Sequence, residues 1–182
     1  ARHHVMASLR SSRLALFRHI LGEAAALEHM GLEGLGSSKS DQDSGNMLQR
    51  IDSLKGRVPE NQLGIDLPEW LTNSKAHQQA CEAEIGIYQI ILRLLERVTD
   101  TRERRKCSLL LELAGRHDQV IAFDHFPLTL RYLQHLITVD VKAQKIDVLL
   151  GVGGNKTQNE QLQKRLDPLK GGGRVIALCS DA

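Results

Sequence analysis

The stretch VIAFDHFPLTLRYLQHLI, residues 120–137, decides the fold. Its first four residues form an uninterrupted apolar run, which is typical of a short strand buried on both faces of a parallel sheet. Pro127 stands where the first residue of a helix belongs, and Leu130, Leu133 and Ile137 follow it at helical spacing. The sequence therefore predicts a strand that is followed at once by a helix.

Two further apolar runs, residues 146–150 and 175–179, repeat the strand pattern downstream. A glycine-rich loop and a helical segment from Thr157 to about Leu166 lie between them. The order strand, helix, strand, helix, strand is a βαβαβ unit, which predicts a right-handed parallel sheet covered by helices.

Residues 1–118 show a different pattern, because their apolar residues recur at helical spacing. Helices are expected over about residues 5–30, 47–55, 74–98 and 100–114. Asp100 and Glu103 have the spacing of a capping box at the start of the last helix. We therefore expect an α/β protein with a helical connecting region over residues 1–118 and the parallel sheet over residues 119–182.

The composition excludes several classes of protein. The chain has 182 residues with 24 Lys and Arg against 22 Asp and Glu, a net charge of +2. This balance excludes a chain that holds nucleic acid by bulk charge, and equally an acidic disordered chain. Aromatic residues make up 3% of the chain, too few for a surface that stacks on bases. No apolar run is long enough to span a membrane.

The cysteines indicate an intracellular protein. Cys81, Cys107 and Cys179 are an odd number of thiols without CxxC spacing, so we expect them to be reduced and expect no zinc site. The N-terminus lacks the apolar run of a signal peptide. The expected compartment is the cytoplasm or nucleoid of a bacterium, or the nucleus of a eukaryote.

The glycine-rich loop GVGGNKT, residues 151–157, follows a predicted strand and opens a helix, as a phosphate-binding loop does. A P-loop requires glycine where Asn155 and Leu150 stand, and the dinucleotide-binding pattern requires glycine where Lys156 stands. Both patterns therefore fail. Two interpretations remain, backbone amides that bind a nucleic-acid phosphate, or an ordinary turn between strand and helix.

Two other features carry candidate chemistry. Asp124 and His125 come directly after the first strand, where functional residues concentrate in such sheets, so they are an acid–base pair, a metal ligand or simply a polar loop start. The basic run of residues 102–106 is either a solvated helix face or a phosphate-contacting surface. No GxSxG or HExxH motif supports nucleophilic catalysis or metallohydrolysis.

Three stretches resemble a known family. Residues 120–133 are similar to the first strand and helix of the second RecA-like lobe in Swi/Snf-like helicases and translocases of superfamily two. Residues 175–182 resemble the strand that opens the fifth motif of that family. Residues 9–16, LRSSRLAL, look like the Arg-rich segment with paired serines that connects the two lobes. The loop at residues 151–156 departs from the family's Asp-Gly-Ser-like turn.

The resemblance implies a partial RecA-like sheet, of the P-loop NTPase type, in an ATPase that moves along duplex DNA. ATP and Mg²⁺ are the implied cofactors of the whole protein, but the family's residues for them belong to the first lobe, so no catalytic or metal-binding residue is expected here. The implied contacts are to the DNA phosphate backbone. They fall to nine residues, Asp124, His125, Phe126, Gly153, Gly154, Asn155, Lys156, Ser180 and Asp181.

The chain stops directly after its third predicted strand, whereas ligands of such sheets bind beyond the strand ends. We therefore expect a fragment of a longer protein that is inactive as an ATPase alone, with the missing first lobe and DNA as partners. The exposed edge of the sheet could also pair with a second copy of the chain. The alternatives are an interaction module without enzymatic activity and a small nucleotide-binding domain.

Overall fold

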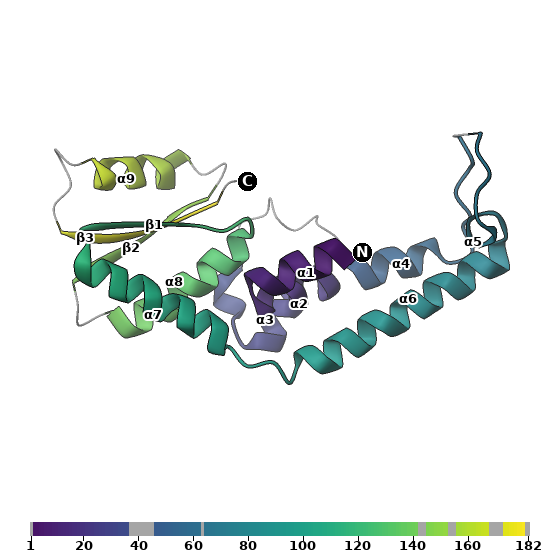
Figure 1. Ribbon diagram of the computed structural model, residues 1–182, viewed down its shortest axis with the longest axis horizontal. Coiled ribbons are helices and arrows are strands. Elements are labelled where there is room, and N and C mark those ends of the chain that lie inside the picture. The colour runs from purple at the N-terminus through teal and green to yellow at the C-terminus, as the bar shows by residue number, and fades with distance from the viewer. Residues whose placement is uncertain are drawn as a thin grey trace. The chain divides into compact units, whose positions relative to one another are not determined.

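The computed structural model describes residues 2–36, 46–62, 64–141, 145–152, 156–167 and 173–180 (Figure 1). Three strands form its sheet: β1 (Gln119–Phe123), β2 (Ile146–Gly151) and β3 (Arg174–Cys179). All pairs are parallel and the order is β1-β3-β2, so the strand that comes last in the chain is central. The predicted α/β class and parallel sheet are thus confirmed for the described residues. The order of the strands had no signal in the sequence.

Helices cover both faces of the sheet. α7 (Thr101–Arg116) and α8 (Pro127–Val141) lie against one face, and α9 (Lys156–Leu166) lies against the other (Figure 1). Residues 175–178 of the central strand are almost fully buried as a result. The core between α7, α8 and the sheet is aliphatic, as the shortage of aromatic residues requires. It contains Cys107, Leu110, Ala114, Val120, Leu130, Leu133, Ile137, Ile146, Ile176 and Leu178.

β1 differs from the prediction of a strand buried on both faces. Val120 is buried beneath α7 and α8, but the side chain of Ile121 is 50% exposed and that of Phe123 is 71% exposed. The reason is that β1 lies at an edge of the sheet, while α9 packs against β2 and β3. An apolar run shows that a strand is apolar on both faces, and it cannot show how far a covering helix extends.

The single helix predicted over residues 5–30 is wrong, because the structure has three helices there. They are α1 (Arg2–Ser11), α2 (Arg13–Leu21) and α3 (Glu23–Met30). Ser12 lies between α1 and α2. It caps α2, since its Oγ accepts a hydrogen bond of 2.9 Å from the backbone N–H of Ala15. Gly22 separates α2 from α3 with a φ of 87°, a value that favours glycine. The apolar periodicity runs through both breaks and so conceals them.

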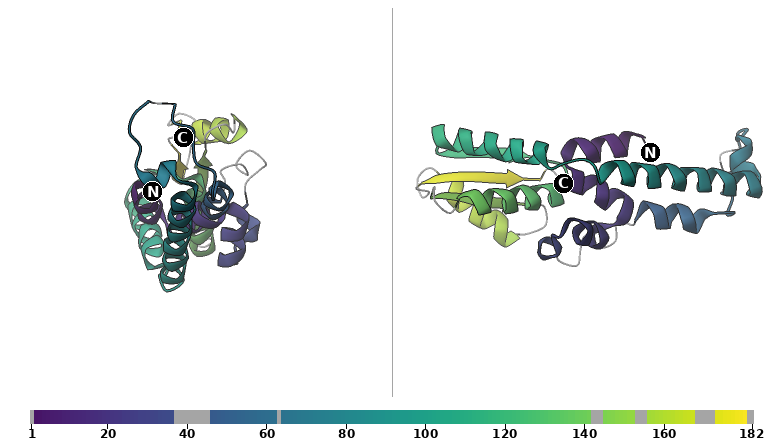
Figure 2. Two further views of the ribbon diagram at one scale, coloured as in Figure 1. Left: turned by 90° about the vertical axis from the view of Figure 1, so that its right-hand side faces the viewer. Right: turned by 90° about the horizontal axis from the view of Figure 1, so that it is seen from below.

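Two shorter helices pack against α6 (Ser74–Leu95), the longest helix that the structure describes. α4 (Met47–Leu54) and the short α5 (Glu69–Thr72) pack against it (Figure 2), and a 3-10 helix, η1 (Glu33–Leu35), follows α3. The side chain of Asn73 caps α6 by accepting hydrogen bonds from the N–H groups of Lys75 and Ala76. The helices predicted over residues 47–55 and 74–98 are confirmed to within three residues. Among the helices that the structure describes, none combines the length and the apolar character needed to cross a bilayer.

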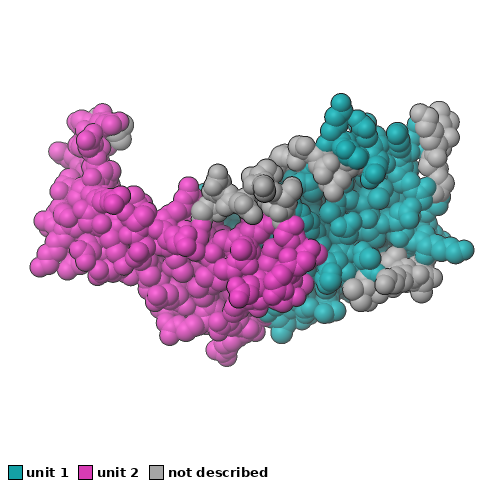
Figure 3. Space-filling view, turned by 180° about the vertical axis from the view of Figure 1, so that it is seen from behind, with its two compact units in different colours: residues 1–16, 99–182 teal, residues 17–98 magenta. Residues whose placement is uncertain are grey.

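The chain forms two compact units (Figure 3). Residues 1–16 and 99–182 make up one, here called the α/β unit, and residues 17–98 make up the other, here called the helical unit. Besides the sheet region predicted over residues 119–182, the α/β unit therefore contains α1, the start of α2 and α7. The polar contacts that hold these segments to the sheet region decide how the candidate site is built.

Candidate functional site

The carboxyl ends of the three strands meet at one edge of the sheet. Phe123 and Gly151 both lie opposite Cys179 in the strand register. Beyond the strands, the N–H of Asp124 donates to the carbonyl of Cys179 at 3.1 Å, and the N–H of Ser180 donates to the carbonyl of Gly151 at 2.8 Å. The segments that follow the strands are therefore held side by side, as expected for a binding edge in a parallel sheet.

Five of the nine predicted DNA-contacting residues lie at this edge in the part of the chain that the structure describes. They are Asp124, His125, Phe126, Lys156 and Ser180. The other four, Gly153, Gly154, Asn155 and Asp181, lie outside the described residues.

The turn after β1 presents an exposed imidazole. His125 is exposed, and its ring meets the ring of Phe126 edge-on with centroids 5.3 Å apart. The N–H of Phe126 donates to Oδ1 of Asp124 at 2.9 Å, and the N–H of Thr129 donates to the carbonyl of Phe126 at 2.9 Å. These two bonds shape the turn that leads into α8. Asp124 thereby holds the backbone of the turn that contains His125.

Lys156 supplies the positive charge of the edge. It is the first residue of α9, directly after the loop that follows β2, and its side chain is exposed. The N-terminal end of a helix carries a partial positive charge, which adds to the charge of the ammonium group. The start of α9 is therefore a favourable place for an anion such as a phosphate.

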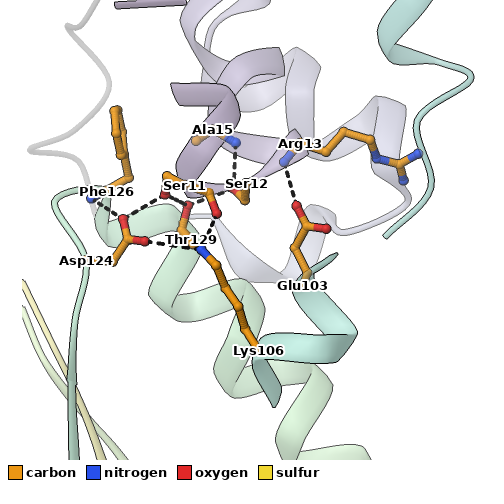
Figure 4. A network of polar contacts seen from close by, with 9 residues as sticks. All are labelled: Ser11, Ser12, Arg13, Ala15, Glu103, Lys106, Asp124, Phe126 and Thr129. Carbon is orange, nitrogen blue, oxygen red and sulfur yellow. Dashed lines mark hydrogen bonds and ion pairs between the residues drawn. The ribbon is translucent and has the colours of Figure 1, made fainter. Parts of the chain in front are cut away.

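Asp124 itself points into the α/β unit. Its Oδ1 accepts a hydrogen bond of 2.7 Å from Oγ of Ser11, in addition to the bond from Phe126, and its Oδ2 lies 3.8 Å from Nζ of Lys106 (Figure 4). A carboxylate engaged in this way, and of the same charge sign as a phosphate, does not suit a backbone contact. Among the predicted residues, Asp124 is thus a positioning residue.

The partners of Asp124 belong to a buried polar cluster. Oγ of Ser11 and Oγ of Ser12 each lie 2.7 Å from Oγ1 of Thr129, and Nζ of Lys106 donates to the carbonyl of Ser11 at 2.6 Å (Figure 4). The hydroxyl groups of Ser12 and Thr129 belong to fully buried residues. We call Ser11, Ser12, Lys106, Asp124 and Thr129 the hydroxyl cluster. It ties the end of α1 to the start of α8, and the sequence had no signal for it beyond the paired serines.

Glu103 also holds the N-terminal segment, residues 9–16, in place. It is fully buried, and its Oε1 accepts a hydrogen bond of 2.7 Å from the N–H of Arg13, the first residue of α2. The capping box predicted for Asp100 and Glu103 does not form. Asp100 makes no side-chain cap bond, and its carboxylate instead accepts from Nε of Arg104 at 2.7 Å. Glu103 caps a helix that is distant in sequence because tertiary packing brings α2 close to it.

The basic run of residues 102–106 is therefore divided between two roles. Glu103 and Lys106 face the N-terminal segment, and Arg104 pairs with Asp100 in an exposed ion pair. Arg102 and Arg105 are exposed. The run is neither a uniform solvated face nor a uniform basic patch.

Gly151 belongs to β2, and its lack of a side chain serves packing. A Cβ at this position would lie 2.6 Å from Cδ2 of Leu162 and 3.2 Å from Sγ of Cys179. α9 can therefore lie close to the sheet only over a glycine. Burial raises the pKa of the neighbouring Cys179 thiol, which keeps it protonated and weakly nucleophilic at neutral pH.

The described residues of this edge show no catalytic constellation. Within the described ranges, no group of three or more His, Cys, Asp or Glu side chains could hold a metal ion. Comparison of the chain with protein-family models, with curated proteins and with solved structures finds no match. The function is therefore argued from the geometry of the strand ends and from the hydroxyl cluster.

Proposed function

We propose that the α/β unit is part of the second RecA-like lobe of a DNA-dependent ATPase, and that the carboxyl edge of its sheet contacts the phosphate backbone of duplex DNA. The observation that carries this proposal is the hydroxyl cluster. It joins residues 9–16 to residues 120–133, two stretches that resemble the same family at separate places in the sequence. Ser11 and Asp124 are 113 positions apart and yet share a hydrogen bond.

This contact suits the proposed role of each stretch. In the family that the chain resembles, the first stretch connects the two lobes and the second opens the second lobe. A connecting segment transmits motion only if it is fixed to its lobe. A buried hydrogen bond between Ser12 and Thr129 and a partly buried one between Arg13 and Glu103 fix it here. Such buried polar contacts specify one arrangement, because an alternative would leave their groups unpaired.

The proposed DNA contacts come from groups that bind phosphate oxygens. Lys156 offers a charge at the start of α9, while His125 and Ser180 offer polar side chains after β1 and β3. Contacts of this kind hold the backbone and carry no sequence information. Exposed Arg102 and Arg105 on α7 extend the basic character of the unit. ATP and Mg²⁺ would be bound chiefly by the first lobe of the whole protein.

Binding to a fluorescent duplex of about 20 base pairs tests the proposal. We expect weak binding at low salt that weakens further as salt is added, because counterions released from the DNA drive it. Lys156→Ala should weaken binding several-fold and reduce the slope of log affinity against log salt by about one. Lys164→Ala is the matched control, since Lys164 is an exposed lysine near the other end of α9. Fluorescence anisotropy measures both variants.

Two results would contradict the proposal. Equal losses in the Lys156 and Lys164 variants would mean that any surface charge serves, and that the strand edge is not the contact. Steady ATP turnover by this chain alone, lost in Lys156→Ala, would indicate a self-contained nucleotide-hydrolysing module, because the groups that act on the γ-phosphate would then lie in this chain.

A further inference from the structure

α6 carries an apolar stripe that the described residues of the helical unit leave exposed. Ala83, Ile87, Ile90 and Leu94 are all exposed, the three larger side chains to between 51% and 57%. The residues are spaced by four, three and four positions, the repeat of a seam between two helices. The inward face of α6 is a different one. Its buried residues are His77, Cys81, Tyr88 and Leu95.

Among the described residues of the helical unit, the stripe is therefore not the face that α6 buries. α4 and α5 pack against α6, and the residues that α6 buries lie on another face than the stripe. An amphipathic helix on the surface needs one apolar face, and α6 has two. Large apolar side chains that line up at seam spacing, rather than lying scattered, mark a contact with another helix.

The charges beside the stripe are arranged so that the helix complements itself. Glu82 lies on one flank of the stripe near its N-terminal end, and Arg93 lies on the same flank near its C-terminal end. Both side chains are exposed. In a parallel pair of α6 helices, like charges would lie at the same level. In an antiparallel pair, Glu82 of each copy lies close to the level of Arg93 of the other.

We propose that the stripe is the contact with a second copy of this chain, in which two α6 helices pack antiparallel about a two-fold axis near Tyr88 and Gln89. This arrangement places Ile87 opposite Ile90, and the small Ala83 opposite the large Leu94. The same surface serves both copies, as a closed two-fold dimer requires. The chain itself supplies both the apolar seam and the opposite charges that the seam needs.

The size of the seam sets the strength of the dimer. At 1.5 Å per residue, the stripe from Ala83 to Leu94 spans roughly 17 Å. A contact of this length buries less than the standard interface of about 1,600 Å². We therefore expect a weak dimer that dissociates on dilution, with a dissociation constant on the order of 10–100 μM.

Sedimentation equilibrium of the full chain between about 5 and 500 μM tests the proposal. Ile90→Asp places a charge in the seam and should leave the chain monomeric throughout this range. Leu54→Asp is the matched control, because Leu54 is equally exposed on α4 but lies off the stripe. Circular dichroism verifies that both variants keep their helix content. Monomers at every concentration of the unmodified chain, or equal weakening by both variants, would overturn the proposal.

A charge exchange distinguishes the antiparallel pair from other arrangements. Glu82→Arg and Arg93→Glu should each weaken the dimer by roughly three- to tenfold, because each creates two like-charge contacts. The double variant restores opposite charges across the two-fold axis and should regain the original dissociation constant. Single variants without effect, or a double variant as weak as the single ones, would overturn the antiparallel arrangement.

Discussion

At the scale of single residues, the meaning of a side chain depends on what is packed against it. Gly151 begins a stretch that resembles a phosphate-binding loop, yet its place in the structure is explained by Leu162 of α9, whose Cδ2 lies 2.6 Å from where a Cβ would be. Gly86 in α6 offers the opposite case, because a Cβ there would have no neighbouring atom within 4 Å. The same residue type thus has a packing role at one position and none at the other.

We expect Gly151→Ala to lower the free energy of unfolding by about 1–3 kcal/mol, because either α9 or the sheet must shift to admit the methyl group. Gly86→Ala is the control and should raise that free energy by up to about 1 kcal/mol, since alanine favours the helix and meets no neighbour. Urea unfolding measures both. Destabilisation of equal size at the two positions would show that Leu162 does not restrict position 151.

At the scale of elements, the N-terminal segment belongs to the sheet that it precedes by about a hundred residues. Two anchors hold it there, the hydroxyl cluster at the end of α1 and Glu103 at the start of α2. The interruption at Ser12 makes this possible. It turns the chain so that Ser11 and Ser12 both reach Thr129, whereas an unbroken helix would point two adjacent side chains about 100° apart.

Thr129→Val tests how much the hydroxyl cluster contributes. The substitution keeps the shape of the side chain and removes the hydroxyl that both serines contact, so it should cost about 1–3 kcal/mol of unfolding free energy. Thr138→Val on the same helix is the control. Thr138 is exposed and its hydroxyl donates to the carbonyl of Gln134 one turn away, so its loss should cost within about 0.5 kcal/mol. Equal losses of unfolding free energy in the two variants, measured by urea unfolding, would show that the hydroxyl cluster does not hold α1 in place.

At the scale of the whole molecule, each unit buries a tyrosine. Tyr88 lies in the helical unit and Tyr132 in the α/β unit, and both are almost fully buried. Burial raises the pKa of both phenols, and the charges of nearby Asp100 and Glu103 raise the pKa of Tyr132 further. A pKa raised by folding means that the folded state favours the neutral phenol. The contribution of each tyrosine to stability is then complete below its ordinary pKa of about 10 and is lost as the pH rises through the raised value.

We therefore expect the unfolding free energy to fall as the pH rises above about 10, after an earlier loss from Cys179, whose pKa is also raised by burial. The double variant Tyr88→Phe, Tyr132→Phe should show a shallower fall over the same range, because it has no phenol to ionise. Urea unfolding at pH 8 and at several values up to 11 measures the difference. Parallel curves for the two proteins would contradict the assignment of the alkaline loss to these residues.

The sequence by itself determined most of the helices and all three strands. Their apolar periodicity is a local property, and local spacing is what α6, α8 and the strands depend on. It also placed Lys156, His125 and Ser180 at strand ends, since the carboxyl ends of parallel strands share one edge. That these residues contact DNA stays a prediction.

Only the tertiary structure decided what joins distant segments. Four features depend on partners that are far away in the chain. They are the central place of β3, the exposed face of β1, the break between α1 and α2 at Ser12, and the hydrogen bond of Glu103 to Arg13 in place of a capping box with Asp100. Ser11 and Thr129 are 118 positions apart, and no spacing rule connects them. The physical reason is that periodicity records which side of a segment is apolar, whereas the partner of a buried polar group is settled only when the chain packs.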